Sequence, residues 1–202
     1  MINETESENS WVKWFLDQPE GRCFVRVDSN YMKDSFNLYG IRAKVEHYKL
    51  AVDYLREPYV VPSQRSKNYP DNIDEIAKKL YGLIHSRFLM TNQGLQLMHE
   101  KYKRKEFENC PNVGCKDTHC LPYGISEEPD QHRVYMYCPS CNDIYIPEDR
   151  KYMNIDGSFF GSAYIVAFLH TYTSIQPPSP PELPQFRLFG FKIDLEEEEY
   201  DD

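Results

Sequence analysis

The spacing of the cysteines between residues 110 and 141 constrains the fold of this chain more than any other feature. Five of its 6 cysteines fall in this stretch. Cys110 and Cys115 form a C-x4-C pair, and Cys138 and Cys141 form a C-x2-C pair. Two short, well-separated cysteine pairs are the sequence form of a tetrahedral zinc site with four thiolate ligands. The sequence therefore predicts a structural zinc ion, because four thiolates leave no open position for catalysis.

The residues around the two pairs predict a zinc ribbon. Residues 133–137 have strand composition, and residues 142–147 predict a turn followed by a second strand. Each cysteine pair would then lie at the tip of a hairpin. A unit this small cannot fold on its apolar area alone, and zinc contributes about 10–16 kcal/mol to such a site.

The setting of these cysteines disfavours disulfide and redox roles. The N-terminal sequence is acidic and polar, unlike a signal peptide, and no stretch resembles a transmembrane span. We therefore expect a protein of the cytoplasm and nucleus, where thiols stay reduced. A thiol oxidoreductase would need a helix directly after Cys141 to lower a thiol pKa, whereas the sequence predicts a strand there.

Three other residues near the pairs compete as metal ligands, namely His119, Cys120 and His132. Both pairs begin with Cys-Pro, at Cys110 and at Cys138, and this symmetry favours a ligand set that includes Cys110. We therefore expect Cys120 to pack as a small apolar side chain, and Cys23 to be a core residue. His85 lies within an apolar pattern and is expected to be a hydrogen-bonded core residue rather than a ligand.

Before the ribbon, apolar residues recur at three- and four-residue steps, which predicts helices. The expected helices follow Ser10, cover residues 45–55 and 73–88, and begin again at Thr91 to end in the basic residues 101–105. Ser10 and Thr91 are expected N-caps, and Asp71 or Asn72 would cap the helix over residues 73–88. Residues 57–72 contain three prolines and are expected to form a loop. After the ribbon, residues 164–172 predict a short buried helix.

The C-terminal part combines a proline-rich stretch with an apolar strand. Residues 177–184, PPSPPELP, predict a stiff polyproline spacer, with an SH3-domain ligand as the alternative. Phe189, Phe191 and Ile193 alternate and would line one face of a strand. Such a strand folds back on its own chain or docks on another protein, and the pattern alone leaves both open.

Charge is unevenly distributed along the chain. The formal net charge is −9, and residues 194–202 hold seven acids and no base. We expect a solvated tail, with weak contact to a basic partner as the alternative. A zinc-ribbon nucleic-acid-binding protein that uses the bases of residues 101–105 is a competing function, but the net negative charge would oppose that binding. No protein-kinase, phosphate-loop or dinucleotide motif is present.

Several stretches of the chain match a known protein family. They are W-x-x-W-F at residues 11–15, DSFNLYG at 34–40, LYGLIHSRFLMT at 80–91, GLQLMHEKY at 94–102, CPNVGC, LPYG and V-Y-M-Y-CPSC in the ribbon, and RLFGFKI at 187–193. On these stretches the chain resembles the casein kinase II regulatory (beta) subunit. The resemblance spans about residues 10–193, and YGLIHSRF and RLFGFKI are its most specific parts.

The resemblance implies an α-helical N-terminal domain followed by a four-cysteine zinc ribbon and a C-terminal docking hairpin. The ribbon would hold a three-stranded antiparallel sheet. The implied division is a disordered acidic N-terminus (residues 1–9), a helical domain (10–104), a zinc-ribbon dimerisation domain (105–161), a helix with spacer and hairpin (162–193), and an acidic tail (194–202).

The family is non-catalytic, so the resemblance implies a regulatory and scaffolding subunit of a Ser/Thr protein kinase. Its ribbons would pair into a homodimer that binds two catalytic casein kinase II alpha subunits. The dimer would stabilise these subunits and tune their choice of protein substrates. No membrane or nucleic-acid partner is expected.

The family's functional residues carry over onto three sets of positions. The zinc ligands fall on Cys110, Cys115, Cys138 and Cys141. The dimer contacts fall on Pro111, Val113, Ile144 and Tyr145. The kinase-docking hairpin falls on Arg187, Leu188, Phe189, Gly190, Phe191 and Ile193, which favours docking for this segment. Thr5 precedes Glu6 and Glu8, an acidic context of the kind that this kinase modifies, with an unmodified terminus as the alternative.

The chain departs from the family pattern at four places. Arg56, Arg65 and Lys67 stand against Glu57 and Asp71 in a loop that is acidic in the family, which puts the polyamine and basic-partner sensing of that loop in doubt. Phe189 stands where many members have Tyr, and Tyr123 is bulkier than the usual residue. The chain also ends in acidic residues soon after the hairpin, where many members continue.

Overall fold

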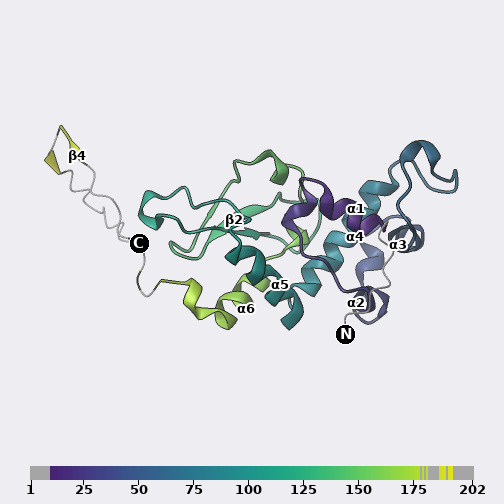
Figure 1. The fold of residues 1–202 in the computed structure, drawn as a ribbon, viewed down its shortest axis with the longest axis horizontal. Helices are drawn as coiled ribbons and strands as arrows, with labels where there is room; N and C mark the ends of the chain where they lie inside the picture. The colour runs from purple at the N-terminus through teal and green to yellow at the C-terminus, as the bar shows by residue number, and fades with distance from the viewer. Residues whose placement is uncertain (1–9, 178, 180, 182–186, 190, 193–202) are drawn as a thin grey trace, which may run out of the picture.

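The computed structural model describes residues 10–177, 179, 181, 187–189 and 191–192. Six α-helices occur in this part of the chain, and they are α1 (Trp11–Asp17), α2 (Ser29–Lys33), α3 (Tyr48–Arg56), α4 (Ile73–Phe88), α5 (Asn92–Lys103) and α6 (Ala163–Thr171). Figure 1 shows α1, α2 and α3 gathered at one end of the molecule and the sheet around β2 toward the other. Within the described residues, no helix combines the length and the apolar character that a membrane span requires.

Helix α4 is the centre of the helical part, as its apolar pattern predicts. Of its 16 residues, 11 are buried. The Tyr81 hydroxyl accepts a hydrogen bond from Val27 N at 3.1 Å and donates one to Val25 O at 3.0 Å. These bonds fix the segment after α1 against α4, because buried backbone groups need partners.

Two of the predicted helix caps are confirmed. The Ser10 hydroxyl accepts from Lys13 N at 3.3 Å, and the Thr91 hydroxyl accepts from Gly94 N at 3.0 Å. Asn72 occupies the cap position of α4, but its side chain makes no capping hydrogen bond. Asp74 and Glu75 lie in the first turn instead, where their negative charge interacts favourably with the positive end of the helix dipole.

Asp74 also anchors the loop over residues 57–72, a role that the sequence pattern did not indicate. Its carboxylate accepts from Trp11 Nε1 at 3.1 Å, from the Tyr54 hydroxyl at 2.8 Å and from Arg65 Nη2 at 2.6 Å. The Arg65 guanidinium lies 5.2 Å from the centre of the Tyr54 ring. One carboxylate therefore joins α1, α3, the loop and α4.

Helix α3 begins later than the periodicity predicts, at Tyr48 rather than residue 45. His47 has a φ of 47°, in the left-handed region, so regular helix cannot extend back through it. Val45 is buried outside the helix. The prediction included Val45 in the helix because it is apolar. Val45 is apolar because it packs in the core, and it lies before the helix begins.

The predicted three-stranded antiparallel sheet is confirmed. Its strands are β1 (Leu121–Tyr123), β2 (Tyr135–Cys138) and β3 (Asp143–Tyr145), in the order β1-β2-β3. The central Met136 pairs with Pro122 on one side and with Tyr145 on the other, and it is buried. Cys138 and Cys141 lie at the turn between β2 and β3, and the Cys110–Cys115 pair lies in the segment before β1.

The helices and the sheet share one continuous buried core. The contact is made by the 3-10 turn Gly157–Phe159, which packs on α4. A Cβ placed on Gly82 would lie 2.2 Å from the Phe159 ring, so only glycine permits this approach. The predicted division at residues 104 and 105 stays a prediction.

The chain ends in a second, two-stranded sheet formed by β4 (Arg187–Leu188) and β5 (Phe191–Lys192). Figure 1 shows β4 apart from the rest of the molecule. Phe189 lies in the turn with a φ of 49°. The expected single strand with Phe189 and Phe191 on one face is therefore wrong, since the turn separates them. Most of the proline-rich spacer lies outside the described residues.

Candidate metal centre

The sulfurs of the two cysteine pairs converge, and we call the short turn that carries each pair a knuckle. The Sγ atoms of Cys110, Cys115, Cys138 and Cys141 all lie within 4.8 Å of one another. The Cys110–Cys141 and Cys115–Cys138 sulfur pairs are each 3.8 Å apart. A tetrahedron with zinc–sulfur bonds of about 2.3 Å has edges of about 3.8 Å, so these distances fit one tetrahedral zinc ion.

Each cysteine pair is held in a tight turn that aims its sulfurs inward. Asn112 N donates to Cys110 Sγ at 3.4 Å, and Ser140 N donates to Cys138 Sγ at 3.4 Å. The Asn112 side chain accepts from Gly114 N at 2.9 Å and so starts the 3-10 turn Val113–Cys115. Two knuckles with the same i to i+2 amide–sulfur bond account for the Cys-Pro symmetry of the sequence.

The four thiols lie in surroundings that require a compensating cation if all of them ionise. Burial and then the neighbouring thiols raise the pKa of Cys110, and burial raises the pKa of Cys115. A hydrogen bond with Cys120 and burial raise the pKa of Cys138. A divalent metal ion at the centre would remove this penalty, because thiolates bound to zinc stay deprotonated.

Tyr145 has a second role that the sequence did not reveal. Its hydroxyl lies 3.2 Å from Cys141 Sγ. Burial opposes ionisation of Cys141, but this hydrogen bond and those of neighbouring groups lower its pKa overall. A hydrogen bond to a ligating sulfur orients the ligand and adjusts its basicity.

The competing ligands do not join the cluster of four sulfurs. The His119 ring is 2.9 Å from Phe107 O through Nδ1, and His132 is exposed. Cys120 is fully buried beside Cys138. Cys23 is likewise buried, and burial raises its pKa to about 12, as expected of an inert core thiol.

The sequence predicts a strand rather than a helix after Cys141, and the structure has β3 there. The feature that lowers a catalytic thiol pKa in redox C-x-x-C motifs is therefore missing from this part of the chain.

Exposed and half-buried apolar residues lie on the two segments that carry the four cysteines. Val113 is 80% exposed and Ile144 is 39% exposed, while Pro111 is exposed and Tyr145 half-buried. Ile146, which no sequence pattern singled out, is also 80% exposed, two residues after Ile144. Apolar side chains on a rigid turn suit the core of a protein–protein contact.

The structure describes only part of the predicted docking segment. Phe189 is 93% exposed and Phe191 is 78% exposed. Arg187 and Leu188 form strand β4, while Gly190 and Ile193 lie outside the described residues, as does Thr5. Two exposed aromatic rings on a two-stranded hairpin are the feature that the structure adds to the sequence pattern.

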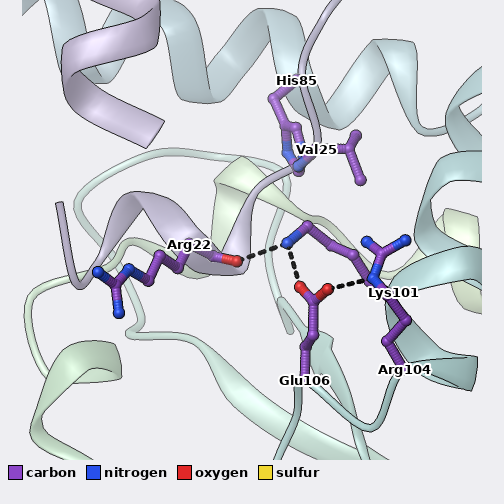
Figure 2. Close-up of polar contacts among 6 residues, drawn as sticks. All are labelled: Arg22, Val25, His85, Lys101, Arg104 and Glu106. Carbon is purple, nitrogen blue, oxygen red and sulfur yellow. Dashed lines mark hydrogen bonds and ion pairs between the residues drawn. The ribbon is translucent and has the colours of Figure 1, made fainter. Parts of the chain in front are cut away.

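The predicted core histidine is confirmed. His85 is fully buried, and its Nε2 accepts from Val25 N at 3.1 Å. The other ring nitrogen, Nδ1, lies 2.7 Å from Phe159 O and therefore carries the proton. Figure 2 shows the His85 ring directed toward Val25. Its two partners come from the segment after α1 and from the 3-10 turn Gly157–Phe159.

Comparison with known proteins gives one consistent family. A sequence model of the family described as "Casein kinase II regulatory subunit" matches residues 10–192. The chain is 38% identical to casein kinase II subunit beta' of Drosophila melanogaster, over 92% of this chain and 84% of that protein. It is 36% identical to casein kinase II subunit beta of Schizosaccharomyces pombe, over 95% and 83% of the two chains. It is also 37% identical to casein kinase II subunit beta-3 of Arabidopsis thaliana, over 92% of this chain and 68% of that protein.

Proposed function

This chain belongs to the casein kinase II regulatory subunit family, and we propose that it binds the catalytic subunits of that kinase as a scaffold. It is a regulatory subunit and not an enzyme. On this proposal the chain stabilises the catalytic subunits and tunes which protein substrates they phosphorylate.

The observation that carries the proposal is the C-terminal hairpin. It presents two phenylalanine rings, Phe189 and Phe191, that are 93% and 78% exposed. Large exposed aromatic side chains are costly in water and typical of binding hot spots. The proposed occupant of this surface is one catalytic kinase subunit per chain.

The ribbons are proposed to pair two chains around their metal centres. Each ribbon holds one structural zinc ion through Cys110, Cys115, Cys138 and Cys141. The exposed Pro111, Val113 and Ile144 then supply the apolar part of the contact, with Tyr145 beside them. The complete assembly would contain two regulatory chains and two catalytic subunits.

Titration of the purified chain with a casein kinase II catalytic subunit tests the proposal. Size-exclusion chromatography with light scattering should give a complex of two chains of each kind. The chain alone should show no phosphoryl transfer, and its addition should change the relative rates on different protein substrates. Separate elution of the two proteins at micromolar concentration would contradict the proposal.

Two further expectations belong to the same proposal. Thr5 is proposed as a phosphorylation site of the assembled kinase, and the protein is proposed to occur in the cytoplasm and nucleus. Mass spectrometry after incubation of the complex with ATP tests the first. Unmodified Thr5 under conditions that label other sites would end it.

A further inference from the structure

A hollow lined by basic side chains lies between the segment after α1 and the end of α5. Its volume is about 440 Å³. The charged residues that line it are Arg22, Arg26, Lys101, Lys151 and Glu106. The lining of the hollow is therefore mostly basic, in a chain whose formal net charge is −9.

The single acid is already shared between two cations. Lys101 Nζ pairs with Glu106 at 2.5 Å, and Arg104 Nε pairs with the other carboxylate oxygen at 2.5 Å. Lys101 Nζ also donates to Arg22 O at 2.7 Å, which ties the first segment to α5 (Figure 2). Burial opposes ionisation of Glu106, but these ion pairs lower its pKa overall.

Net positive charge remains when every printed ion pair is counted, because four bases (Arg22, Lys101, Arg104 and Lys151) stand against two acids, Glu106 and Asp149. Figure 2 shows the Arg22 guanidinium directed away from Glu106, and this side chain is exposed. Lys151 reaches the hollow from the 3-10 turn Arg150–Tyr152, with its ammonium 4.9 Å from the Tyr152 ring centre and 3.1 Å from Asp149. Leu16 and Phe24 add an apolar wall. Such a hollow fits a peptide that carries several carboxylates.

We propose that this hollow binds an acidic peptide segment, and that its occupant is the C-terminal end of the same chain, residues 194–202. This segment, DLEEEEYDD, holds seven acids and no base. This segment lies outside the described residues. The assignment therefore rests on its charge, on the length of the chain that joins it to Tyr172 (the tether), and on the position of Tyr172.

The tether begins beside the helix that carries the hollow. Tyr172, directly after α6, stacks on His99 of α5 with ring centres 3.8 Å apart. His99 is two residues before Lys101, although on another side of the helix. Between Tyr172 and Asp194 lie 21 residues, of which residues 173–175 form a 3-10 turn and residues 187–192 form the β4–β5 hairpin. The remaining 12 residues span up to about 40 Å when extended. Tethering at such lengths gives local concentrations near the millimolar range, so the chain's own tail competes well against any free acidic peptide.

This inference does not rest on the proposed kinase-binding function, because it concerns two parts of one chain. Its first test uses a fluorescent DLEEEEYDD peptide and two full-length proteins. One is the natural chain, and the other carries Asn or Gln in place of the seven tail acids. The peptide should bind the neutral-tail protein at least tenfold more tightly than the natural chain, because the natural tail competes. Equal binding to both would overturn the assignment of the tail.

Charge removal at the hollow gives the matched control. In the neutral-tail protein, Arg22→Gln with Lys151→Gln should weaken peptide binding roughly tenfold, as expected when two partly exposed ion pairs are lost. Arg42→Gln with Lys49→Gln removes the same charge from an exposed stretch elsewhere and should change affinity less than twofold. Equal effects of the two pairs would show non-specific attraction and overturn the site. Tighter binding of a single-stranded oligonucleotide than of the peptide would also overturn it, in favour of nucleic acid.

Zero-length carbodiimide cross-linking tests occupancy in the natural protein. The tail carboxylates should form amide bonds with Lys101 or Lys151, as mapped by mass spectrometry. A mixture of ¹⁵N-labelled and unlabelled protein separates links within a chain from links between chains. Links found only between chains, or only to lysines remote from the hollow, would overturn the proposal.

Discussion

His85 is a titratable residue with no solvent contact, and both of its ring nitrogens are already used. Burial, opposed only in part by the hydrogen bond to Phe159 O, lowers its pKa from 6.5 to about 4. The folded state therefore binds fewer protons than the unfolded state between these two values. Stability from this group is complete above pH 6.5 and is lost as the pH falls toward 4.

A His85→Gln variant should flatten this pH dependence. Between pH 7 and pH 5.5, the wild-type free energy of unfolding should fall by about 1 kcal/mol more than that of the variant. Urea unfolding at both pH values measures the two slopes, and absolute stability does not enter the comparison. Identical slopes would mean that His85 titrates normally in the folded protein.

The cysteine assignments give a second prediction at single residues. Cys138→Ser should release the metal, because one of four thiolates is lost from a tetrahedral site. Cys120→Ser, a buried neighbour outside the cluster of four sulfurs, should keep one zinc per chain. Elemental analysis of both purified variants measures this directly. Zinc retained by the first variant and lost by the second would exchange their roles.

The sequence predicted these residues with uneven success, for a physical reason. Cysteine spacing along a tight turn is a local property, so Cys110 and Cys141 could be assigned before the fold was known. The hydrogen bond from Tyr145 to a sulfur and the three bonds to Asp74 join residues that are brought together by packing. No local pattern carries such information, and both were missed.

At the scale of elements, the approach of α4 to the turn Gly157–Phe159 is the most sensitive contact. Alanine is a better helix former than glycine, so Gly82→Ala would stabilise an exposed helix by about 1 kcal/mol. Here the added methyl group meets the Phe159 ring, so we expect a loss of about 1–3 kcal/mol instead. Guanidinium unfolding checks the sign of the change.

The double variant Gly82→Ala with Phe159→Leu supplies the control for this contact. Leucine leaves room beside α4, so the cost of the alanine should shrink in its presence. An alanine that destabilises both backgrounds equally would place the cause in the helix itself and not in the contact.

Element boundaries could be predicted where capping chemistry fixes them and not where packing does. Thr91 and Ser10 start their helices as expected, because a hydroxyl at the cap is a local signal. The apolar pattern placed the start of α3 too early, because Val45 is buried in the core but lies outside the helix. The alternation of Phe189 and Phe191 suggested a single strand, whereas a turn at Phe189 makes a hairpin. An alternating pattern of apolar residues cannot distinguish a single strand from a hairpin when a residue of the turn is itself apolar.

At the scale of the whole molecule, pairing of two ribbons has a direct test. Val113 is 80% exposed in the single chain and would lie in the core of the proposed contact. Val113→Glu would bury an unpaired charge there, at a cost of several kcal/mol, and should give a monomer by light scattering. Val61→Glu places the same charge on an exposed valine of the loop over residues 57–72 and should leave the mass unchanged. A dimeric Val113 variant would exclude this surface from the interface.

The kinase contact depends on the hairpin, and Phe191 on strand β5 is its expected anchor. Truncation of an aromatic anchor typically costs about 2–4 kcal/mol, so Phe191→Ala should weaken binding of a catalytic subunit roughly 30- to 1000-fold. Phe36→Ala removes an equally exposed ring from another turn and should leave the affinity unchanged. Calorimetry measures the affinities, while zinc content and dimer mass should stay at wild-type values in both variants. If Phe191→Ala bound the catalytic subunit with wild-type affinity, the Phe191 ring would not be part of the contact. If the variant lost its dimer, the hairpin would instead hold the two regulatory chains together.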